Sequence, residues 1–266
     1  MGRDRKETMK LLITGHRGFI GSNALTYFKS KYDVDTYEYN QTLPDLDAGY
    51  DWVLHFGAIS STTESDVEKV MHQNYDFSCW LLDECNNRNI KLQYSSSASV
   101  YGLGRDFREI APPDPRTPYA WSKYLFDRHV ANGHWNTVVQ GFRYFNVYGA
   151  GENHKGDQAS PYHKFTQQAQ ETGIIRLFEG SDRFYRDFVP VDLVVKTHDK
   201  FLSISKSGVW NVGTGQARSF QSVAEEIAKK YNARIEYIPM PERLKAGYQA
   251  YTCADLTAIR EALSGS

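Results

Sequence analysis

The sequence has few cysteines, no long apolar run and almost no net charge. Its three cysteines, Cys79, Cys85 and Cys253, form no Cys-x-x-Cys pair, which argues against a metal cluster or a disulfide framework. The longest apolar stretches, at 11–14 and 52–59, are too short to span a bilayer, and the charged N-terminus lacks the apolar core of a secretory signal. The 31 basic and 32 acidic residues leave a formal net charge of −1. We therefore expect a soluble cytoplasmic protein that binds neither nucleic acid nor membrane.

Short apolar runs alternate with helical patterns through the first half of the chain, which is typical of βαβ units and a parallel sheet. The expected strands are 10–14, 34–39, 52–56, 92–96 and 138–144, and the expected helices lie at 21–31, within 65–87 and at 118–131. The second half predicts helices near 160–172 and at 219–231, a strand at 234–239, and short apolar segments at 186–191 and 209–213. The predicted fold class is α/β, a Rossmann-type doubly wound parallel sheet.

The alternation breaks near Gly149, which predicts two interleaved parts in the chain of 266 residues. Residues 1–9 are mostly charged or polar and are expected to form a disordered lead-in. A dinucleotide-binding Rossmann domain is expected over 10–147 and 188–214. The remaining segments, 148–187 and 215–266, predict a smaller C-terminal lobe that binds the substrate.

Three glycines follow the first expected strand at spacings of three residues: Gly15, Gly18 and Gly21. Glycines at these positions tighten the turn, let backbone amides approach a pyrophosphate and let the helix pack on the sheet. The positive end of the helix then faces the phosphates. Glycines also occur in other strand-to-helix turns, but the place at the first such turn favours a dinucleotide site.

The end of the second strand indicates which dinucleotide binds. Glu38 follows Gly18 by 20 residues and suits a ribose hydroxyl, which favours NAD; Asn40 lies close enough to share the role. Arg17, inside the glycine loop, is well placed to meet a 2′-phosphate, which favours NADP. An exposed loop arginine without a ligand fits the same position. We predict NADP, with NAD as the alternative.

A tyrosine and a lysine four residues apart, Tyr119 and Lys123, share one face of an expected helix. A nearby ammonium favours tyrosinate, so we expect Lys123 to lower the pKa of Tyr119 and make it a usable base. Ser97 ends an expected strand, where open α/β sheets build their sites, and suits a hydrogen bond to a reacting oxygen. A Tyr–Lys pair on a wet helix face is common, but the glycine loop and the serine upstream make chance unlikely to produce all three.

This trio resembles the extended short-chain dehydrogenase/reductase superfamily, and further strings resemble one family within it, the ADP-L-glycero-D-manno-heptose 6-epimerases. The resemblance runs from about Lys10 to Arg260 and rests on FGAISSTTE (56–64), GFRYFNVYG (141–149), HKG (154–156), LFEGS (177–181), RDFV (186–189), NVGTG (211–215) and QAYTCADL (249–256).

The resemblance implies an epimerase that oxidises C6″ of an ADP-bound heptose with tightly held NADP, turns the keto sugar and returns the hydride to its other face. It implies two acid/base groups, Tyr119 and Lys155, with Lys123 on the nicotinamide ribose and Ser97 on the reacting oxygen. From the residues alone, Lys155 is an ordinary loop lysine. A homo-oligomer is also expected.

Other positions matched to the family are expected around the two ligands. Arg186 is the expected pyrophosphate clamp, in preference to a salt bridge with Asp187. The chain departs from the family at Asp157, where a serine is usual, and at Lys164, where a histidine is usual; its C-terminal lobe is expected to be shortened. Near the cofactor we expect Phe19, Ile20, Gly57, Ala58, Asn74, Val147 and Lys155, and near the nucleotide-sugar Ser60, Asn146, Asp157, Lys164, Phe178, Glu179, Gly180, Ser181, Arg186 and Tyr248.

Two other functions remain open from the sequence. One is an NADPH-dependent nucleotide-sugar reductase or epimerase/reductase, because the GHRG loop at 15–18 also resembles GDP-fucose synthases. The other is a sensor that binds the dinucleotide without turnover, a role that usually goes with loss of the tyrosine or the lysine.

Overall fold

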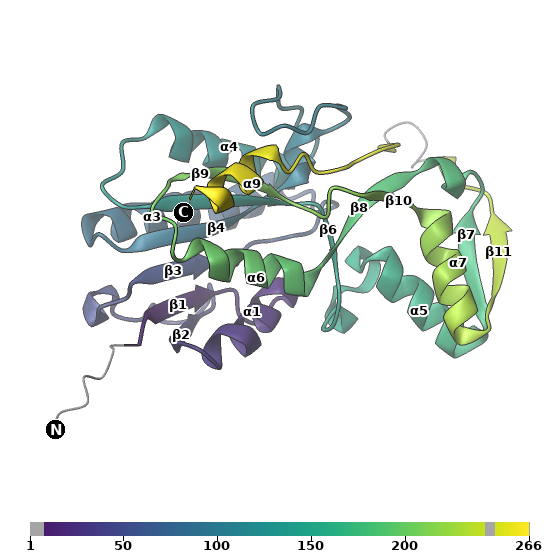
Figure 1. The fold of residues 1–266 in the computed structure, drawn as a ribbon, viewed down its shortest axis with the longest axis horizontal. Coiled ribbons are helices and arrows are strands. Elements are labelled where there is room, and N and C mark those ends of the chain that lie inside the picture. The colour runs from purple at the N-terminus through teal and green to yellow at the C-terminus, as the bar shows by residue number, and fades with distance from the viewer. Residues whose placement is uncertain (1–7, 243–247, 266) are drawn as a thin grey trace.

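A computed structural model of the chain describes residues 8–242 and 248–265, so most of the expected lead-in at 1–9 lies outside the described residues. Six parallel strands form the main sheet in the order β2-β1-β3-β4-β5-β9 (Figure 1). Their bounds are Lys10–Thr14 (β1), Asp33–Tyr37 (β2), Trp52–His55 (β3), Lys91–Ser97 (β4), Val139–Tyr144 (β5) and Gly208–Val212 (β9). This arrangement confirms the predicted Rossmann-type fold.

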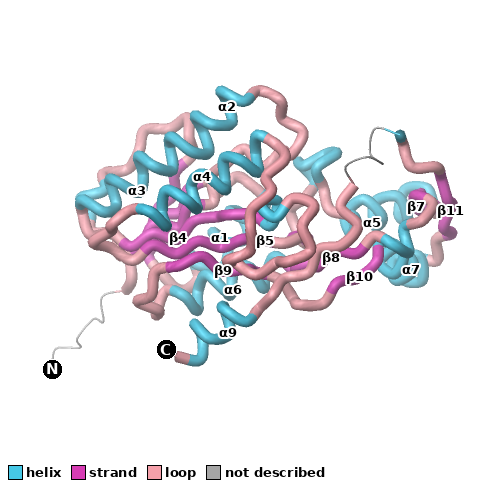
Figure 2. Tube along the Cα trace, turned by 90° about the horizontal axis from the view of Figure 1, so that it is seen from above, coloured by secondary structure: helices cyan, strands magenta, loops and turns pink. Residues whose placement is uncertain are grey.

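Helices cover both faces of the sheet, which explains why its strands are continuous apolar runs. Leu11 and Ile13 of β1 pack towards α1 and α6, whereas Leu12 packs towards α3 and α4. Figure 2 shows α2, α3 and α4 on one side of the strands and α6 on the other. The bounds are Phe19–Lys29 (α1), Val67–Met71 (α2), Phe77–Asn87 (α3), Pro118–Asn132 (α4) and Val191–Phe201 (α6).

The helix expected within 65–87 is interrupted by one π-helical turn, His72–Asp76, between α2 and α3. Asn74 is the buried residue of that turn. Such a turn inserts an extra residue into the helix and is frequent at functional sites.

A smaller lobe extends beyond the carboxyl ends of the strands, at the right of Figure 1. Its helices α5 and α7 pack around Phe165, Ile175, Phe188 and Val223. The bounds are Asn146–Tyr148 (β6), Pro161–Thr172 (α5), Ile174–Phe178 (β7), Tyr185–Pro190 (β8), Ala217–Ser219 (β10), Phe220–Tyr231 (α7) and Arg234–Ile238 (β11). Strands β10, β8 and β6 form one small sheet, and β11 pairs with β7 in another.

Two helices differ from the sequence-based expectation. Residues 186–191 were expected only as an apolar segment, but the strand β8 passes directly into α6. The last helix, α9 (Thr257–Ser264), belongs to a segment assigned to the smaller lobe. Its Ile259 and Ala262 instead share a core with Phe142 and Trp210 of β5 and β9, because that edge of the sheet offers apolar surface to cover.

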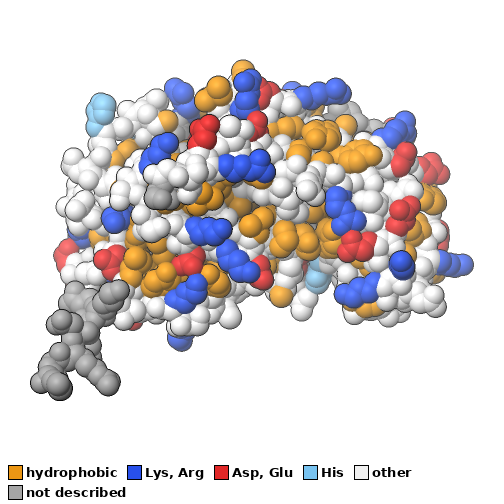
Figure 3. Space-filling view, viewed as in Figure 1, with side chains coloured by type: hydrophobic (Ala, Val, Ile, Leu, Met, Phe, Trp, Pro, Cys, Tyr) orange, Lys and Arg blue, Asp and Glu red, His pale blue; other side chains and the backbone are white. Residues whose placement is uncertain are grey.

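Among the described residues, no helix is long and apolar enough to cross a membrane. Basic and acidic side chains are interspersed over the face shown in Figure 3, in keeping with the near-balance of charge.

Candidate active site

The glycine loop brings β1 and β3 together at the start of α1. Gly15 has a φ of +73°, and a Cβ there would overlap the backbone of Gly57; a Cβ at Gly21 would overlap the carbonyl of Gly15. These two glycines are therefore required by the packing of the chain itself. Gly18, the N-cap of α1, is different: its φ is −72°, and a Cβ would meet only the Gly15 carbonyl oxygen at 3.4 Å. The bare backbone at Gly18 fits an approaching ligand rather than a need of the fold.

A cavity of about 440 Å³ lies between this loop and the end of β2, lined by Arg17, Gly18, Glu38, Asn40, Gly57 and Ala58 among others. One Glu38 oxygen accepts the Arg17 backbone N–H at 2.6 Å, so this carboxylate also ties the glycine loop to β2. The Arg17 side chain is exposed. The glycine cradle and the polar pocket beside it fit a dinucleotide.

A second cavity, of about 270 Å³, shares Gly15, Gly18 and Ala58 with the first and reaches Ser60 and Lys155. The Lys155 ammonium lies 5.0 Å from the centroid of the Phe19 ring. Burial lowers the pKa of Lys155, and the charge of Glu152 opposes that shift. Lys155 is therefore a half-buried lysine within a cavity, rather than an ordinary loop cation.

Glu152 organises the loop that carries Lys155, a role that sequence reasoning missed. It is 1% exposed, and its carboxylate accepts the backbone N–H groups of Gly149 and Ser160 at 3.0 and 2.6 Å and the Ser160 hydroxyl at 2.8 Å. The Lys155 N–H donates to the Glu152 carbonyl at 2.9 Å. In the sequence, Glu152 is only an acidic residue three positions before Lys155. Such a pair is common in surface loops, so it could not have indicated this role.

Ser97 and Tyr119 meet where β4 ends and α4 begins. The Ser97 hydroxyl accepts the Ser99 backbone N–H at 3.1 Å and acts on the pKa of the nearby Tyr119 phenol. Burial raises the pKa of Tyr119, and the Ser97 hydrogen bond partly opposes this. The expectation that Lys123 lowers this pKa differs from the structure, in which burial dominates the environment of the phenol.

Lys123 is 5% exposed, and its ammonium donates to the backbone carbonyl of Ser95 at 2.8 Å. The ammonium lies 6.0 Å from the centroid of the Tyr119 ring. Burial lowers the pKa of Lys123 to about 8, with the Asp127 charge acting against that shift. The side chain is thus fixed by the sheet and carries its charge at neutral pH.

Asn74 acts on the loop after β3 rather than directly on a cavity. Its amide oxygen accepts the Ile59 N–H at 2.7 Å, and its amide nitrogen donates to the Ile59 carbonyl at 2.9 Å and to the Ser122 hydroxyl at 3.1 Å. These bonds fix the segment that contains Gly57 and Ala58 against α4.

Arg186 lies in the smaller lobe and is 9% exposed. Its guanidinium carbon lies 5.4 Å from the ring centroid of Phe220 and 5.3 Å from that of Tyr248, and one nitrogen donates to the Tyr185 carbonyl. Burial lowers its pKa. No carboxylate among the described residues forms an ion pair with it, which is the state of a cation that awaits an anionic ligand.

Apart from Ser60, which follows β3 and lines the second cavity, the other expected substrate residues lie in the smaller lobe or at its junction with the sheet. Phe178 ends β7, Gly180 follows with a φ of +78°, and Ser181 is 4% exposed. Asn146 lies in β6, next to Val147, which was expected near the cofactor. The Lys164 ammonium donates to the Asp157 carbonyl at 2.7 Å, so the two departures from the family contact each other. Ser60 and Glu179 are exposed.

Residues 8–242 and 248–265 contain no cluster of side chains that could hold a metal ion. A larger cavity of about 750 Å³ lies beside the C-terminal half of α4 and includes none of the predicted site residues. The glycine loop, the two smaller cavities and the Ser–Tyr–Lys cluster lie together at the carboxyl ends of β1, β3 and β4, where open α/β sheets bind ligands.

Solved structures resemble this chain over almost its whole length. ADP-L-glycero-D-manno-heptose-6-epimerase from Helicobacter pylori superposes with a TM-score of 0.86 at 28% identity, covering 97% of this chain and 91% of that one. UDP-N-acetylglucosamine 4-epimerase from Methanobrevibacter ruminantium, solved with UDP-N-acetylmuramic acid, gives 0.85 at 22% identity, covering 96% and 92%. RMD from Pseudomonas aeruginosa, complexed with NADPH, gives 0.79 at 21% identity, covering 97% and 93%.

The predicted resemblance to heptose 6-epimerases is thereby confirmed, and the name of the matching family supports a nicotinamide dinucleotide as cofactor. The sequence profile of the NAD dependent epimerase/dehydratase family matches residues 11–213, well over half of the chain. The chain belongs to the NAD dependent epimerase/dehydratase family.

Proposed function

We propose that the chain is a nucleotide-sugar epimerase that inverts C6″ of ADP-glycero-manno-heptose by transient oxidation, with NADP retained through the cycle. One observation carries the proposal. Ser97, the Tyr119 phenol and the fixed ammonium of Lys123 lie at the same sheet edge as the glycine loop, beside a cavity lined by the half-buried Lys155. Two groups able to transfer protons are what inversion on two faces of one carbon requires.

The bound dinucleotide would accept a hydride from C6″ and return it. When C6″ is oxidised, Tyr119 takes the hydroxyl proton and Ser97 hydrogen-bonds the same oxygen. Lys123, which is protonated below a pKa of about 8, would hold the nicotinamide ribose. After the keto sugar turns, Lys155 donates a proton to the oxygen in its new position, and the two groups then exchange protons with solvent. The lowered pKa of Lys155 suits this exchange.

The diphosphate of the substrate would bind Arg186. A guanidinium offers two parallel donors to phosphate oxygens, and the rings of Phe220 and Tyr248 hold it in place before the ligand arrives. The lobe that contains Arg186 is therefore the side on which we place the nucleotide of the substrate.

The decisive experiment combines cofactor identification with turnover. Mass spectrometry of the purified protein is expected to find bound NADP(H), and the protein should convert ADP-D-glycero-D-manno-heptose to its L-glycero epimer without added NADPH. In D₂O the product should carry no carbon-bound deuterium, since the migrating hydrogen stays on the cofactor. Stoichiometric consumption of NADPH with deuterium incorporation would instead identify an epimerase/reductase, and protein without dinucleotide affinity would contradict redox chemistry altogether.

Variants assign the two proton-transfer groups. Tyr119→Phe and Lys155→Met should each slow turnover by about 10²–10⁴-fold. The double variant should cost far less than the product of the two effects, because the residues act as a unit. Lys196→Met, an exposed lysine on α6, is the matched control and should retain normal turnover. Normal turnover in Lys155→Met, together with a slow Tyr119→Phe, would exclude Lys155 as the second base.

A further inference from the structure

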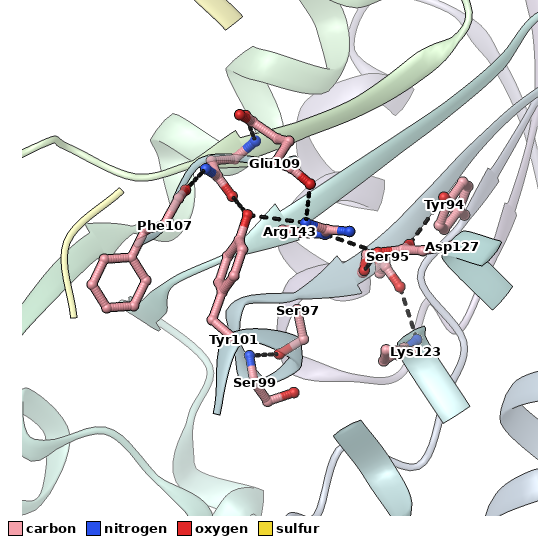
Figure 4. Close-up of polar contacts among 12 residues, drawn as sticks. Tyr94, Ser95, Ser97, Ser99, Tyr101, Phe107, Glu109, Lys123, Asp127 and Arg143 are labelled. Carbon is pink, nitrogen blue, oxygen red and sulfur yellow. Dashed lines mark hydrogen bonds and ion pairs between the residues drawn. The ribbon is translucent and has the colours of Figure 1, made fainter. Parts of the chain in front are cut away.

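Two residues on consecutive turns of α4, Lys123 and Asp127, form hydrogen bonds with β4 (Figure 4). Lys123 donates to the carbonyl of Ser95 at 2.8 Å, one turn after Tyr119. Asp127, one turn further on, accepts the hydroxyls of Tyr94 and Ser96, both at 3.0 Å. The face of the helix that carries Tyr119 and Lys123 therefore continues into a buried carboxylate whose hydrogen bonds go to Tyr94, Ser96 and Arg143.

Asp127 is 3% exposed and fully engaged. Besides the two hydroxyls, it accepts Arg143 Nε at 2.8 Å from the neighbouring strand β5. Arg143 in turn donates to the Tyr101 hydroxyl at 3.0 Å and to the Glu109 carbonyl at 3.1 Å. A buried ion pair is expensive to desolvate and is often no more stable than apolar residues of the same size. Stability alone therefore does not account for this pair.

We propose that Asp127 is a positioning residue for Lys123: its carboxylate keeps the buried ammonium protonated and fixes α4 in register with β4. The inference deepens the function proposed above, since it rests on the role given to Lys123 there. It assigns no contact with substrate or cofactor to Asp127 itself.

The other ionisable groups around Lys123 are neutral or cationic, which leaves Asp127 to stabilise the protonated ammonium. His55 on β3 is neutral at physiological pH, because burial lowers its pKa to about 3. Burial raises the pKa values of Tyr94 on β4, Tyr144 on β5 and Tyr119 on α4, so these phenols are neutral as well. Arg143 on β5 is the other charged group of the cluster and is cationic. Among the described groups facing Lys123, Asp127 thus supplies the negative charge, and it opposes the lowering of the Lys123 pKa by burial.

Loss of that charge should release protons from Lys123 at neutral pH. In Asp127→Asn the pKa of Lys123 is expected to fall by about one unit, below its value of about 8 in the parent protein. The measurement is a ¹³C NMR titration of protein labelled at lysine Cε, with the signal assigned by its absence in Lys123→Arg. The basic limb of the rate profile with ADP-heptose should move to lower pH by the same amount.

Tyr101→Phe is the matched control. It removes a buried hydroxyl from the same network, on the far side of Arg143, and leaves the charge of Asp127 in place. The pKa of Lys123 should stay within about 0.3 units of the parent value in this variant. A fall of equal size in Tyr101→Phe would show that the network acts only through packing, which would overturn the proposal.

If Asp127→Asn alone does not fold, the pair Asp127→Asn/Arg143→Met removes both charges together, a change that buried ion pairs usually tolerate. The pKa of Lys123 should fall by about one unit in this variant too, because Asp127 is the charge that acts on the ammonium. An unchanged Lys123 pKa in either variant would refute the inference. The titration needs no substrate, so failure of the parent protein to turn over ADP-heptose would count against the proposed function and not against this assignment.

Discussion

Arg186 and Asp187 are neighbours in the chain, yet their side chains point to opposite faces of β8 and form no ion pair with each other. Successive residues of a strand point to opposite faces. Asp187 is fully buried and accepts the backbone N–H groups of Thr214, Gly215 and Ala254 at 2.9, 2.9 and 3.1 Å. With its neighbouring acid occupied in this way, the guanidinium is left for a ligand.

Arg186→Met should therefore weaken binding of ADP by about 10–100-fold, the worth of hydrogen bonds to a charged group. Binding of NADP should not change, because the glycine loop lies elsewhere. Calorimetric titration with ADP measures the effect. Arg218→Met is the control: Arg218 lies directly opposite Arg186 in the β8–β10 pair but is engaged by Glu226 and Tyr162. Equal losses in both variants would remove the special role of Arg186.

The glycine loop offers a test that separates folding from binding. Gly21→Ala should lower the melting temperature, since the new methyl group overlaps the Gly15 carbonyl. Gly18→Ala has room in the protein and should keep the parent melting temperature, but should weaken NADP binding by at least ~10-fold if a pyrophosphate lies against this backbone. Thermal unfolding and fluorescence titration report the two effects. Full affinity in Gly18→Ala would move the phosphates away from this turn.

Arg17 and Glu38 should select between the two dinucleotides. Because the Arg17 side chain is exposed at the cavity rim, Arg17→Ala should weaken NADP about 10-fold or more and leave NAD almost unchanged. Glu38→Gln should weaken the binding of both NADP and NAD, because the Glu38 carboxylate also accepts the Arg17 backbone N–H. Dissociation constants for NADP and NAD measure these effects. An equal loss of affinity for NADP and NAD in Arg17→Ala would leave Glu38 as the residue that selects between them.

The sequence predicted those parts of the fold that depend on residues close together in the chain. The glycine loop and the strand-helix alternation over 10–144 depend on neighbours in sequence and could be read from it. The helix α6 could not: it follows Pro190 directly, without a side-chain N-cap, so its first residues look like the end of a strand. The ring of Phe220 on Arg186 and the Asp127–Arg143 pair join distant elements, which a single sequence does not reveal. In the same way, the pattern Tyr–x–x–x–Lys predicted the pair but not the burial that raises the pKa of Tyr119.

Two buried histidines should make the protein less stable in mild acid. Burial lowers the pKa values of His55 and His198 to about 3, from 6.5 in the unfolded chain. Between these values the unfolded state binds more protons than the native state, so the free energy of unfolding falls as pH falls from 6.5 towards 3. Between pH 7 and pH 5 each histidine should cost about 2 kcal/mol.

Urea unfolding at pH 7 and pH 5 measures this loss. In His198→Gln it should be smaller by about 2 kcal/mol than in the parent protein. His72→Gln, at an exposed position, should leave it unchanged. A parent-like loss in His198→Gln would mean that His198 is accessible to protons in the native state.

The position of β9 bears on how the protein is made. This strand closes the edge of the sheet by pairing with β5, yet the chain runs through β6, the smaller lobe and α6 before it returns to form it. Strand β5 is fully buried in the folded protein. During synthesis, one row of its backbone N–H and C=O groups therefore stays unpaired until β9 has been made. Chains that pause in this interval would present an apolar, unpaired strand edge to one another, so we expect slow synthesis across the smaller lobe to raise the risk of aggregation.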